Sequence, residues 1–487
     1  MLEQEQSVEQ EVDIIVIGAG GAGLAAAVSG SAAGAQVVVL EKSHEMGGTT
    51  QWAVGSISGA CTRLQKIHGI VDSIKDFQED MDLFTADLLP KDNFELRSLL
   101  AQEAGITIDW LESMGIIFAG PYPEKPHRVP RMHNTIPGPS FILKTLLDKA
   151  IKSGVKFLYS VKTQRLILGE EGRVVGVEYL KLGKLYQLRA RRAVILATGD
   201  FSGDELMRRT YLSKAAANAI PICPQNTGEG HLMAQALGAS LCNMDIIFGP
   251  QMRFPRSPKI SFLETIPNWS ILARLGRFLL RYLPPFALKP LVAPLMVSNM
   301  SPSEKLFQQG AVLLDADGDL LNTDTPAFSM AMSPSKKAYI IFGQATAKLF
   351  NTFPNYVSTA PGIAYAYVDD YLAARPDVAQ AYDNVSEVAQ ALNIGEQKLS
   401  ASLKDLPAGK KVVLGPIYPM LTTTEGGVSV DTQCRVLGMD KSPIKGLYAV
   451  GCVGQGGMVL RGHGLHLAWV FTSGRIAGSL APKLKAA

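Results

Sequence analysis

A glycine-rich turn between a buried strand and a small-residue helix constrains this chain more than any other feature. The turn reads Gly-Ala-Gly-Gly-Ala-Gly over residues 18–23, after a β-branched run at 13–17 and before an alanine-rich stretch at 24–34. A second apolar run at 36–40 ends at Glu41. The uncharged stretch 14–40 is long enough for a membrane span. Its change of character instead predicts a strand, a tight turn, a helix and a second strand.

Each glycine of this turn has a physical reason in a nucleotide-binding βαβ unit. Gly18 permits the tight turn, Gly20 lets a pyrophosphate approach the main chain, and Gly23 lets helix and strand pack closely. The helix N-terminus offers unpaired N–H groups to phosphates, and the carboxylate of Glu41 can accept hydrogen bonds from ribose hydroxyls. The alternative is that the glycines only form a turn. The predicted cofactor contacts here are Gly18, Gly20, Gly21, Ala22, Gly23, Glu41 and Lys42.

Composition and charge exclude several classes of protein. With 487 residues, 47% hydrophobic and 19% charged, the chain can bury large cores and needs more than one folded unit. The net charge of +3 is too small to indicate a nucleic-acid binder. The five cysteines are scattered without a CxxC pair, which predicts neither a disulfide framework nor a metal site. The acidic first twelve residues do not resemble a secretory signal, so we expect a cytoplasmic protein.

A second glycine turn follows closely, with Gly47 and Gly48 before Thr49 and Thr50. It lies too near the first turn to belong to another fold, so its N–H groups are predicted to reach the same pyrophosphate. Further strands are predicted at 155–161, 192–199 and 446–451, the last followed by a glycine loop and a helix from about Gly464. Segments from both ends of the chain must therefore build one site.

These motifs together resemble those of FAD-dependent oxidoreductases of the fumarate reductase and 3-ketosteroid dehydrogenase superfamily. The resemblance extends from Asp13 to Gly478. It is carried by GAGGAG at 18–23, the segments 41–60, 193–209 and 226–239, GLYAVG at 446–451 and SGRIAG at 473–478. It implies an α/β fold in which a Rossmann-type FAD-binding domain is interrupted by an α+β capping domain. The predicted domains are 1–243 and 365–487 for FAD binding and 244–364 for the cap.

The resemblance also implies a cofactor and further contacts to it. The FAD is expected to be noncovalent, because residues 47–50 contain no attachment histidine of the family type. The flavin would exchange a hydride at a carbon–carbon bond next to a carbonyl or carboxylate. The further cofactor contacts that the resemblance implies are Gly47, Gly48, Thr49, Thr50, Gly55, Val161, Ala197, Thr198, Gly199, Gly451, Gly464 and Leu465. For Val161 and Thr198, ordinary strand packing is the alternative.

Two departures from the family pattern bear on the substrate. Fumarate reductases carry an arginine acid where this chain has Phe328, and a His-His-Thr segment where it has Thr at 422–424. A phenylalanine ring suits a large hydrophobic substrate better than a dicarboxylate. We therefore predict that Phe328 and Thr423 lie in the substrate pocket.

Three residues are predicted to be catalytic. Tyr418 resembles the tyrosine with which ketosteroid dehydrogenases polarise a carbonyl, although a core aromatic is an equal alternative. Arg461 resembles the arginine that grips a carboxylate in fumarate reductases, and pairing with Glu425 or with the reduced flavin is its alternative. His463 is the better proton-transfer candidate, whereas for His466 we favour flavin contact or packing.

The leading hypothesis is a dehydrogenase or reductase of a bulky hydrophobic substrate, such as a 3-ketosteroid-like or terpenoid enone, with an unidentified electron donor or acceptor. The first alternative is a fumarate- or urocanate-like reductase of an unsaturated carboxylate, favoured by Arg461. The second is a flavoprotein that binds membranes or partners without turnover.

Two other segments carry local predictions. Residues 269–284 place Arg274, Arg277 and Arg281 on one helical face among leucines, which is typical of a helix on an anionic membrane surface. A cap helix with a solvated basic face is the alternative. Residues 310–322 have an Asp-Gly hairpin pattern, and their three spaced aspartates lack the closing glutamate of a calcium loop.

Overall fold

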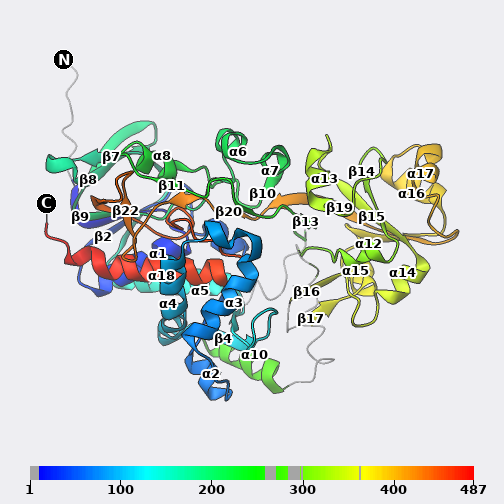
Figure 1. Ribbon diagram of the computed structural model, residues 1–487, viewed down its shortest axis with the longest axis horizontal. Coiled ribbons are helices and arrows are strands. Elements are labelled where there is room, and N and C mark those ends of the chain that lie inside the picture. Colours follow the sequence, from blue (N-terminus) through cyan, green and yellow to red (C-terminus); the bar gives the residue numbers. More distant parts are fainter. Residues whose placement is uncertain (1–9, 258–269, 283–296, 298–299, 361–363, 487) are drawn as a thin grey trace.

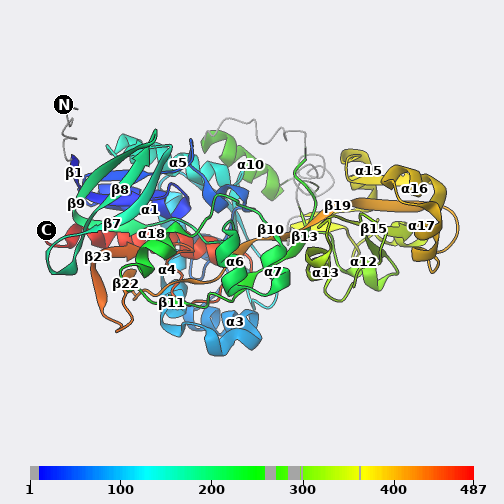
Figure 2. The same cartoon turned by 90° about the horizontal axis from the view of Figure 1, so that it is seen from above.

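An eight-stranded sheet forms the core of the larger of two units, which lie side by side along the long axis of the molecule (Figures 1 and 2). The structure is a computed structural model and describes residues 10–257, 270–282, 297, 300–360 and 364–486. The strands of this sheet are β1 (Gln10–Ile17), β2 (Val37–Leu40), β6 (Lys156–Leu158), β7 (Val161–Leu168), β8 (Val174–Lys181), β9 (Lys184–Leu196), β22 (Arg435–Leu437) and β23 (Pro443–Ala449).

The predicted βαβ unit is confirmed. Strand β1 pairs in parallel with β2, placing Ile14 opposite Val37, and with β9 on its other side. Helix α1 (Gly21–Ala32) connects β1 to β2. The stretch 14–40 is therefore two buried strands and a helix, and no helix in the described part of the chain is long and apolar enough to cross a bilayer. The Rossmann-type α/β fold class is confirmed.

The C-terminal helix α18 (Leu465–Leu480) packs directly along α1, which joins the two ends of the chain (Figure 1). Small residues allow this close approach. A Cβ atom on Gly474 would lie 2.4 Å from Ala22 O, and one on Gly478 would lie 2.3 Å from Ala26 O. Since both distances are far below van der Waals contact, the glycines of α18 determine how near the two helices lie.

Further helices and a small sheet complete the larger unit. The antiparallel sheet β3 (Ser56–Ser58), β5 (Met132–Ile136) and β4 (Ile117–Tyr122) carries α10 (Ser270–Tyr282) on its outside. The other helices of this region are α2 (Arg63–Ile67), α3 (Ile74–Thr85), α4 (Phe94–Ser113), α5 (Pro139–Lys152), α6 (Glu205–Tyr211), α7 (Lys214–Asn218) and α8 (Glu229–Gln235), with 3-10 turns η1 (Gly48–Trp52) and η2 (Ala86–Lys91).

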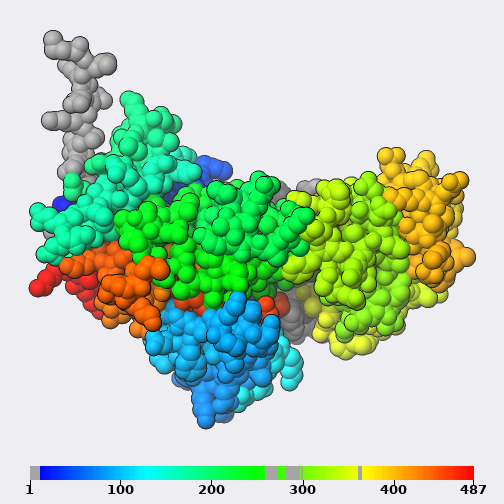
Figure 3. All heavy atoms as spheres, turned by 45° about the horizontal axis from the view of Figure 1, so that its top comes forward, coloured from blue at the N-terminus to red at the C-terminus, as the bar shows by residue number. Residues whose placement is uncertain are grey.

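The smaller unit is built on a six-stranded sheet. Its strands are β10 (Ile220–Pro221), β13 (Gln251–Arg253), β14 (Val312–Asp315), β15 (Ala338–Gly343), β18 (Ala379–Tyr382) and β19 (Lys411–Leu421). Its helices are α12 (Lys305–Gln308), α13 (Pro326–Met332), α14 (Gln344–Leu349), α15 (Val368–Ala374), α16 (Val385–Leu392) and α17 (Glu396–Ser402). Space-filling spheres show this unit as a separate mass beside the larger one (Figure 3).

The predicted cap boundary at residue 364 divides this six-stranded sheet. Strands β14 and β15 precede residue 364, whereas β18 and β19 follow it and pair with β15 or with each other. Apolar side chains from both sides of 364 share one core. We propose that the cap extends to about residue 421, because hydrophobic burial holds these strands together as one unit.

The aspartate-rich segment forms a turn. The carboxylate of Asp315 accepts hydrogen bonds from the main-chain N–H groups of Asp317 and Asp319, at 3.0 and 2.9 Å. Its second oxygen accepts from Ser333 at 3.0 Å. Asp315 therefore stabilises the turn by accepting hydrogen bonds from these main-chain and serine donors.

Candidate functional site

A cavity of about 590 Å³ opens at the carboxyl ends of the parallel strands of the large sheet. Its lining includes Gly18 after β1, Glu41 after β2, Ala197 after β9 and Gly451 after β23. In open α/β sheets, ligands bind at this edge because the loops of several strands converge there.

The first glycine turn has the shape of a phosphate cradle. Gly18 has φ +107°, and a Cβ on Gly23 would lie 1.9 Å from Gly18 O, so the close packing of helix against strand requires both glycines. A Cβ on Gly20 would meet only Gly47 O, at 3.8 Å. The space above Gly20 is therefore open to a ligand, as the sequence predicts.

The second glycine turn lies directly against the first. Gly20 and Gly47 form an isolated parallel bridge, and Gly47 N donates to Ala19 O at 3.1 Å. Thr50 Oγ1 accepts a hydrogen bond from Gly21 N at 3.3 Å. The two turns thus lie edge to edge and line the same cavity.

The acidic residue after β2 is fixed by main-chain donors. Glu41 Oε2 accepts from Ala19 N at 2.7 Å and Oε1 accepts from Ser43 N at 2.8 Å. The neighbouring Lys42 instead pairs with Glu229 at 2.7 Å. Both side chains line the cavity.

Four buried polar atoms in the cavity wall make no hydrogen bond to any residue that the structure describes. They are Trp52 Nε1, Thr163 Oγ1, Thr198 Oγ1 and Thr422 Oγ1. Buried polar groups are normally satisfied, so this set indicates a polar ligand. Thr163 and Thr198, together with the open space above Gly20, fit FAD.

Most of the predicted cofactor contacts lie in this cavity wall. They are Gly18, Gly20, Gly21, Ala22, Glu41, Lys42, Gly48, Thr49, Thr50, Gly55, Val161, Ala197, Thr198, Gly199, Gly451 and Gly464. Gly23 and Gly47 shape the two turns from behind, and Leu465 is buried in the core at the start of α18. The contacts themselves remain predictions.

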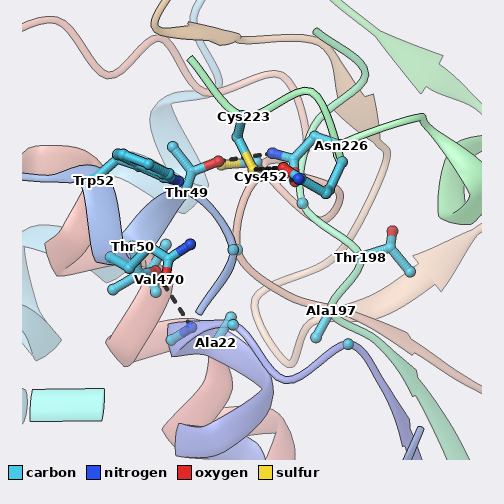
Figure 4. Close-up of a pocket in the computed structure, with 18 of the residues that line it drawn as sticks. Ala22, Thr49, Thr50, Trp52, Ala197, Thr198, Cys223, Asn226, Cys452 and Val470 are labelled. Atoms are coloured by element: carbon cyan, nitrogen blue, oxygen red, sulfur yellow. Dashed lines mark hydrogen bonds between the residues drawn. The ribbon is translucent and has the colours of Figure 1, made fainter. Parts of the chain in front are cut away.

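An amide side chain that the sequence analysis did not single out organises one wall of the cavity. Asn226 donates to Thr49 Oγ1 at 2.7 Å (Figure 4). It also donates to Asp200 Oδ1 at 2.6 Å. Asp200 is buried and also accepts from Thr424 N at 2.7 Å. Asn226 begins the motif at 226–239, so that motif was the available signal.

Two cysteines also face this cavity, Cys223 and Cys452 (Figure 4). Burial raises the pKa of the Cys452 thiol to about 12 and raises that of Cys223 as well. Both are therefore neutral thiols near pH 7. Thr423 Oγ1 lies 3.9 Å from the sulfur of Cys452.

The cavity continues to a second group of residues near the junction with the cap. Thr422 N donates to Phe248 O at 3.2 Å, between β12 (Ile247–Phe248) and β20 (Thr423–Thr424). His466 from α18 and Arg253 from β13 also line this part of the wall. The sequence analysis missed Phe248 and Arg253 because they lie in no motif.

The predicted catalytic residues are not gathered together in this structure. His463 lines the cavity, but Glu124 binds both its main-chain N–H and its Nδ1. Arg461 lies outside the wall, 3.6 Å from Asp87 Oδ1. Tyr418 lies on β19 opposite Arg253 and outside the wall. Their catalytic roles remain predictions.

The two predicted substrate-pocket residues are also separated. Thr423 lines the cavity, and its hydroxyl donates to Thr424 O at 3.2 Å. Phe328 lies on α13 of the cap, 38% exposed and outside the cavity wall. Only Thr423 therefore contacts this volume.

A protein-family model matches most of this chain. It covers residues 13–272 and 303–462 and is described as an FAD binding domain. The chain belongs to this FAD-binding family. The predicted cofactor FAD is thus confirmed.

Sequence relatives and solved structures agree with this assignment. The chain is 24% identical to a probable fumarate reductase of Shewanella frigidimarina, with 97% of this chain and 75% of the relative covered. It is 27% identical to a urocanate reductase of Eggerthella lenta, with the same coverage.

Among solved structures, the open conformation of a flavocytochrome c3 fumarate reductase matches with a TM-score of 0.73 at 23% identity, over 97% of this chain and 78% of that chain. A 3-ketosteroid-Δ4-(5α)-dehydrogenase of Rhodococcus jostii matches with 0.61 at 22% identity, over 98% of both. Both structures share the fold of this chain. With the family match and the sequence relatives, the predicted superfamily is confirmed, and the protein is an FAD-dependent oxidoreductase of the CH–CH type at the level of the family.

Proposed function

We propose that this protein transfers a hydride between its flavin and a carbon–carbon bond next to a carbonyl, on a substrate with a bulky apolar body. When FAD is bound, it supplies the hydride chemistry. Gly20, Gly48 and Thr49 would hold its phosphates, and Glu41 its ribose. The chain's own residues would then bind and orient the substrate in the part of the cavity that lies near the cap.

One observation carries this proposal. Thr422 lines the same cavity as the apolar rings of Trp52 and Phe248, and its buried hydroxyl has no hydrogen-bond partner among the described residues. A neutral hydroxyl can donate to a carbonyl oxygen and stabilise the enolate that forms when the adjacent carbon reacts. The rings supply apolar contact for a large substrate body.

The arrangement of arginines bears on the charge of the substrate. Arg461, the residue on which the carboxylate hypothesis rested, is outside the cavity wall on Asp87. Arg253 does line the cavity, and a guanidinium is suited to a carboxylate. An unsaturated monocarboxylate is therefore the second candidate, favoured by Arg253 alone.

A screen of the chemically reduced holoenzyme tests the proposal. Without oxygen, bulky enones should reoxidise the flavin at least tenfold faster than unsaturated acids of similar size. Arg461→Lys should leave this reaction within threefold of the native rate, because a neutral substrate needs no bidentate partner. Reoxidation by unsaturated acids only, lost in Arg253→Gln, would favour the carboxylate reductase.

The reaction also needs an external electron carrier, since the flavin must regain its starting redox state after each turnover.

We further propose that α10 contacts an anionic membrane. Its Ala273 is buried and a Cβ on Gly276 would lie 3.2 Å from Ile136 Cγ2, so this side packs on the small sheet. Leu275 and Phe278 are 52% and 57% exposed on another side, and Arg274 is exposed between these two sides.

A further inference from the structure

A buried carboxylate and a cavity histidine form a pair that neither the motifs nor the family resemblance predicted. Glu425 lies in the turn between β20 and β21 (Gly427–Val428) and is 0% exposed. It accepts hydrogen bonds from His466 Nε2 and Leu460 N, both at 2.9 Å, and from Gln455 Nε2. An ionised carboxylate is costly to bury unless several donors compensate it.

These donors keep Glu425 ionised. Burial by itself raises the pKa of this carboxyl, but the charge and hydrogen bond of His466, with the bonds from Leu460 N and Gln455, hold it below its usual value. The pKa of the Asp92 carboxyl is raised by burial, and the negative charge of Glu425 adds to this rise. Glu425 is therefore a permanent negative charge behind the cavity wall.

His466 faces the cavity from the first turn of α18. Its side chain is 20% exposed and its ring lies 5.4 Å from that of Phe248. Because Nε2 faces a carboxylate, the hydrogen-bond network assigns a proton to Nε2. Nδ1 makes no hydrogen bond to the residues that the structure describes, so it is the ring atom that can gain or release a proton.

The other groups of the wall are less suited to proton transfer at this place. The neutral thiols of Cys223 and Cys452 hold their protons tightly. His463 has its Nδ1 occupied by Glu124. In the described part of the chain, His466 forms a hydrogen bond with the anion Glu425, and its ring contacts the uncharged ring of Phe248. Glu425 is therefore the charged group beside the imidazole.

We propose that His466, oriented by Glu425, exchanges the proton with the reacting substrate carbon. This inference rests on the proposed function. In the reductive direction, the C=C π bond breaks, one carbon receives a hydride from reduced flavin, which is oxidised, and the other receives the proton of His466 Nδ1. The imidazole left neutral then regains a proton from solvent. His466 takes the place of the absent arginine acid, and Glu425 is a positioning residue.

The decisive variant is His466→Gln, because a glutamine amide can still donate to Glu425 but cannot carry a proton. It should retain FAD and be reduced by dithionite normally, and its reoxidation by oxygen should be unchanged. Reoxidation by the alkene identified with the native enzyme should be about 100-fold slower. The exposed His68→Gln is the matched control and should behave as native.

Glu425→Gln tests the positioning role. It should slow the alkene reaction about tenfold, and the loss of rate with rising pH should begin at lower pH, since no anion stabilises the protonated ring. A merely structural role would reduce FAD content or thermal stability without moving the pH profile.

Nitrogen NMR of histidine-labelled holoenzyme gives a readout that needs no substrate. The spectra should show hydrogen on Nε2 of His466, while Nδ1 should exchange a proton with solvent. An unchanging Nδ1, or an alkene rate in His466→Gln within threefold of native, would overturn the inference. If no alkene reoxidises the native enzyme, the proposed function fails, and the NMR titration still decides whether His466 exchanges a proton.

Discussion

Gly20 and Gly47 pair as an isolated parallel bridge, which holds the two glycine turns edge to edge. The pairing places the turn that follows β1 and the turn that follows β2 at the same cavity. A Cβ on Gly20 would meet only Gly47 O, at 3.8 Å, and the φ of Gly20 is −76°. The protein itself therefore leaves room for a side chain at Gly20, and only a ligand would compete for it.

Gly20→Val should abolish FAD binding while the chain still folds. The branched side chain would fill the space predicted for the pyrophosphate, and its Cβ would come no closer to the protein than 3.8 Å from Gly47 O. Flavin absorbance per protein should fall below a tenth of native, with native secondary structure by circular dichroism. Gly395→Val, at an open position of the cap, is the control and should keep its flavin. A yellow Gly20→Val protein would contradict the prediction.

The FAD should be released by acid precipitation, because the bond to it is predicted to be noncovalent. Residues 47–50 contain no histidine, and the side chain of His44 is 86% exposed and lies 3.8 Å from Glu45. The supernatant should carry the yellow colour and contain intact FAD by chromatography. Flavin that stays with the precipitated protein would show a covalent link.

The substitution Thr422→Val should slow alkene reduction by about 10- to 100-fold at unchanged FAD content, because the unpartnered hydroxyl would be lost from the carbonyl site. Tyr418→Phe should cost less than threefold, since Tyr418 lies outside the cavity wall. Single-turnover reoxidation of both variants measures this difference. The opposite order would restore Tyr418 as the carbonyl donor that the sequence predicts.

Stability should fall as the pH drops through the range in which His133 is protonated only in the unfolded chain. Burial lowers the pKa of His133 from 6.5 to about 4, while its ring atoms lie 2.9 Å from Thr62 Oγ1 and 2.7 Å from Arg131 O. The unfolded state thus binds more protons between these values. The linked loss is about 2 kcal/mol between pH 7 and pH 5.

His133→Gln should show a smaller decrease in the free energy of unfolding over that pH range than the native protein. Urea titrations at both pH values give the comparison. His44→Gln, at a histidine whose side chain is 86% exposed, should keep the native pH dependence. An equal decrease in native protein and His133→Gln would contradict the assignment.

Helix α10 should bind anionic vesicles through charge and apolar area together. Sedimentation with phosphatidylserine vesicles should weaken at high salt, in Arg274→Glu, and in the double variant Leu275→Ser with Phe278→Ser. The predicted role of Arg281 lies outside the described side chains. Leu206→Ser, at a 75% exposed leucine of α6, is the matched control. Equal sedimentation of all variants would remove the membrane proposal.

The sequence by itself determined the nucleotide-binding half of this protein. The turn at Gly18 to Gly23, the acid at Glu41 and the strand ending at Ala197 follow local rules, because backbone conformation and strand burial depend on neighbouring residues. Gly18, Gly20, Glu41 and Ala197 therefore line the cavity where the motif predicts them.

Only the tertiary structure decided the cap boundary and the reactive side of the cavity. Strand β19 joins β15 across residues far apart in sequence, so no local pattern marks the end of the cap. The pairing of Glu425 with His466, and the separation of Arg461 and Tyr418 from the cavity wall, depend on how loops from different strands pack. Side-chain burial and hydrogen-bond partners arise from such long-range contacts, which a residue's own neighbours in the sequence do not specify.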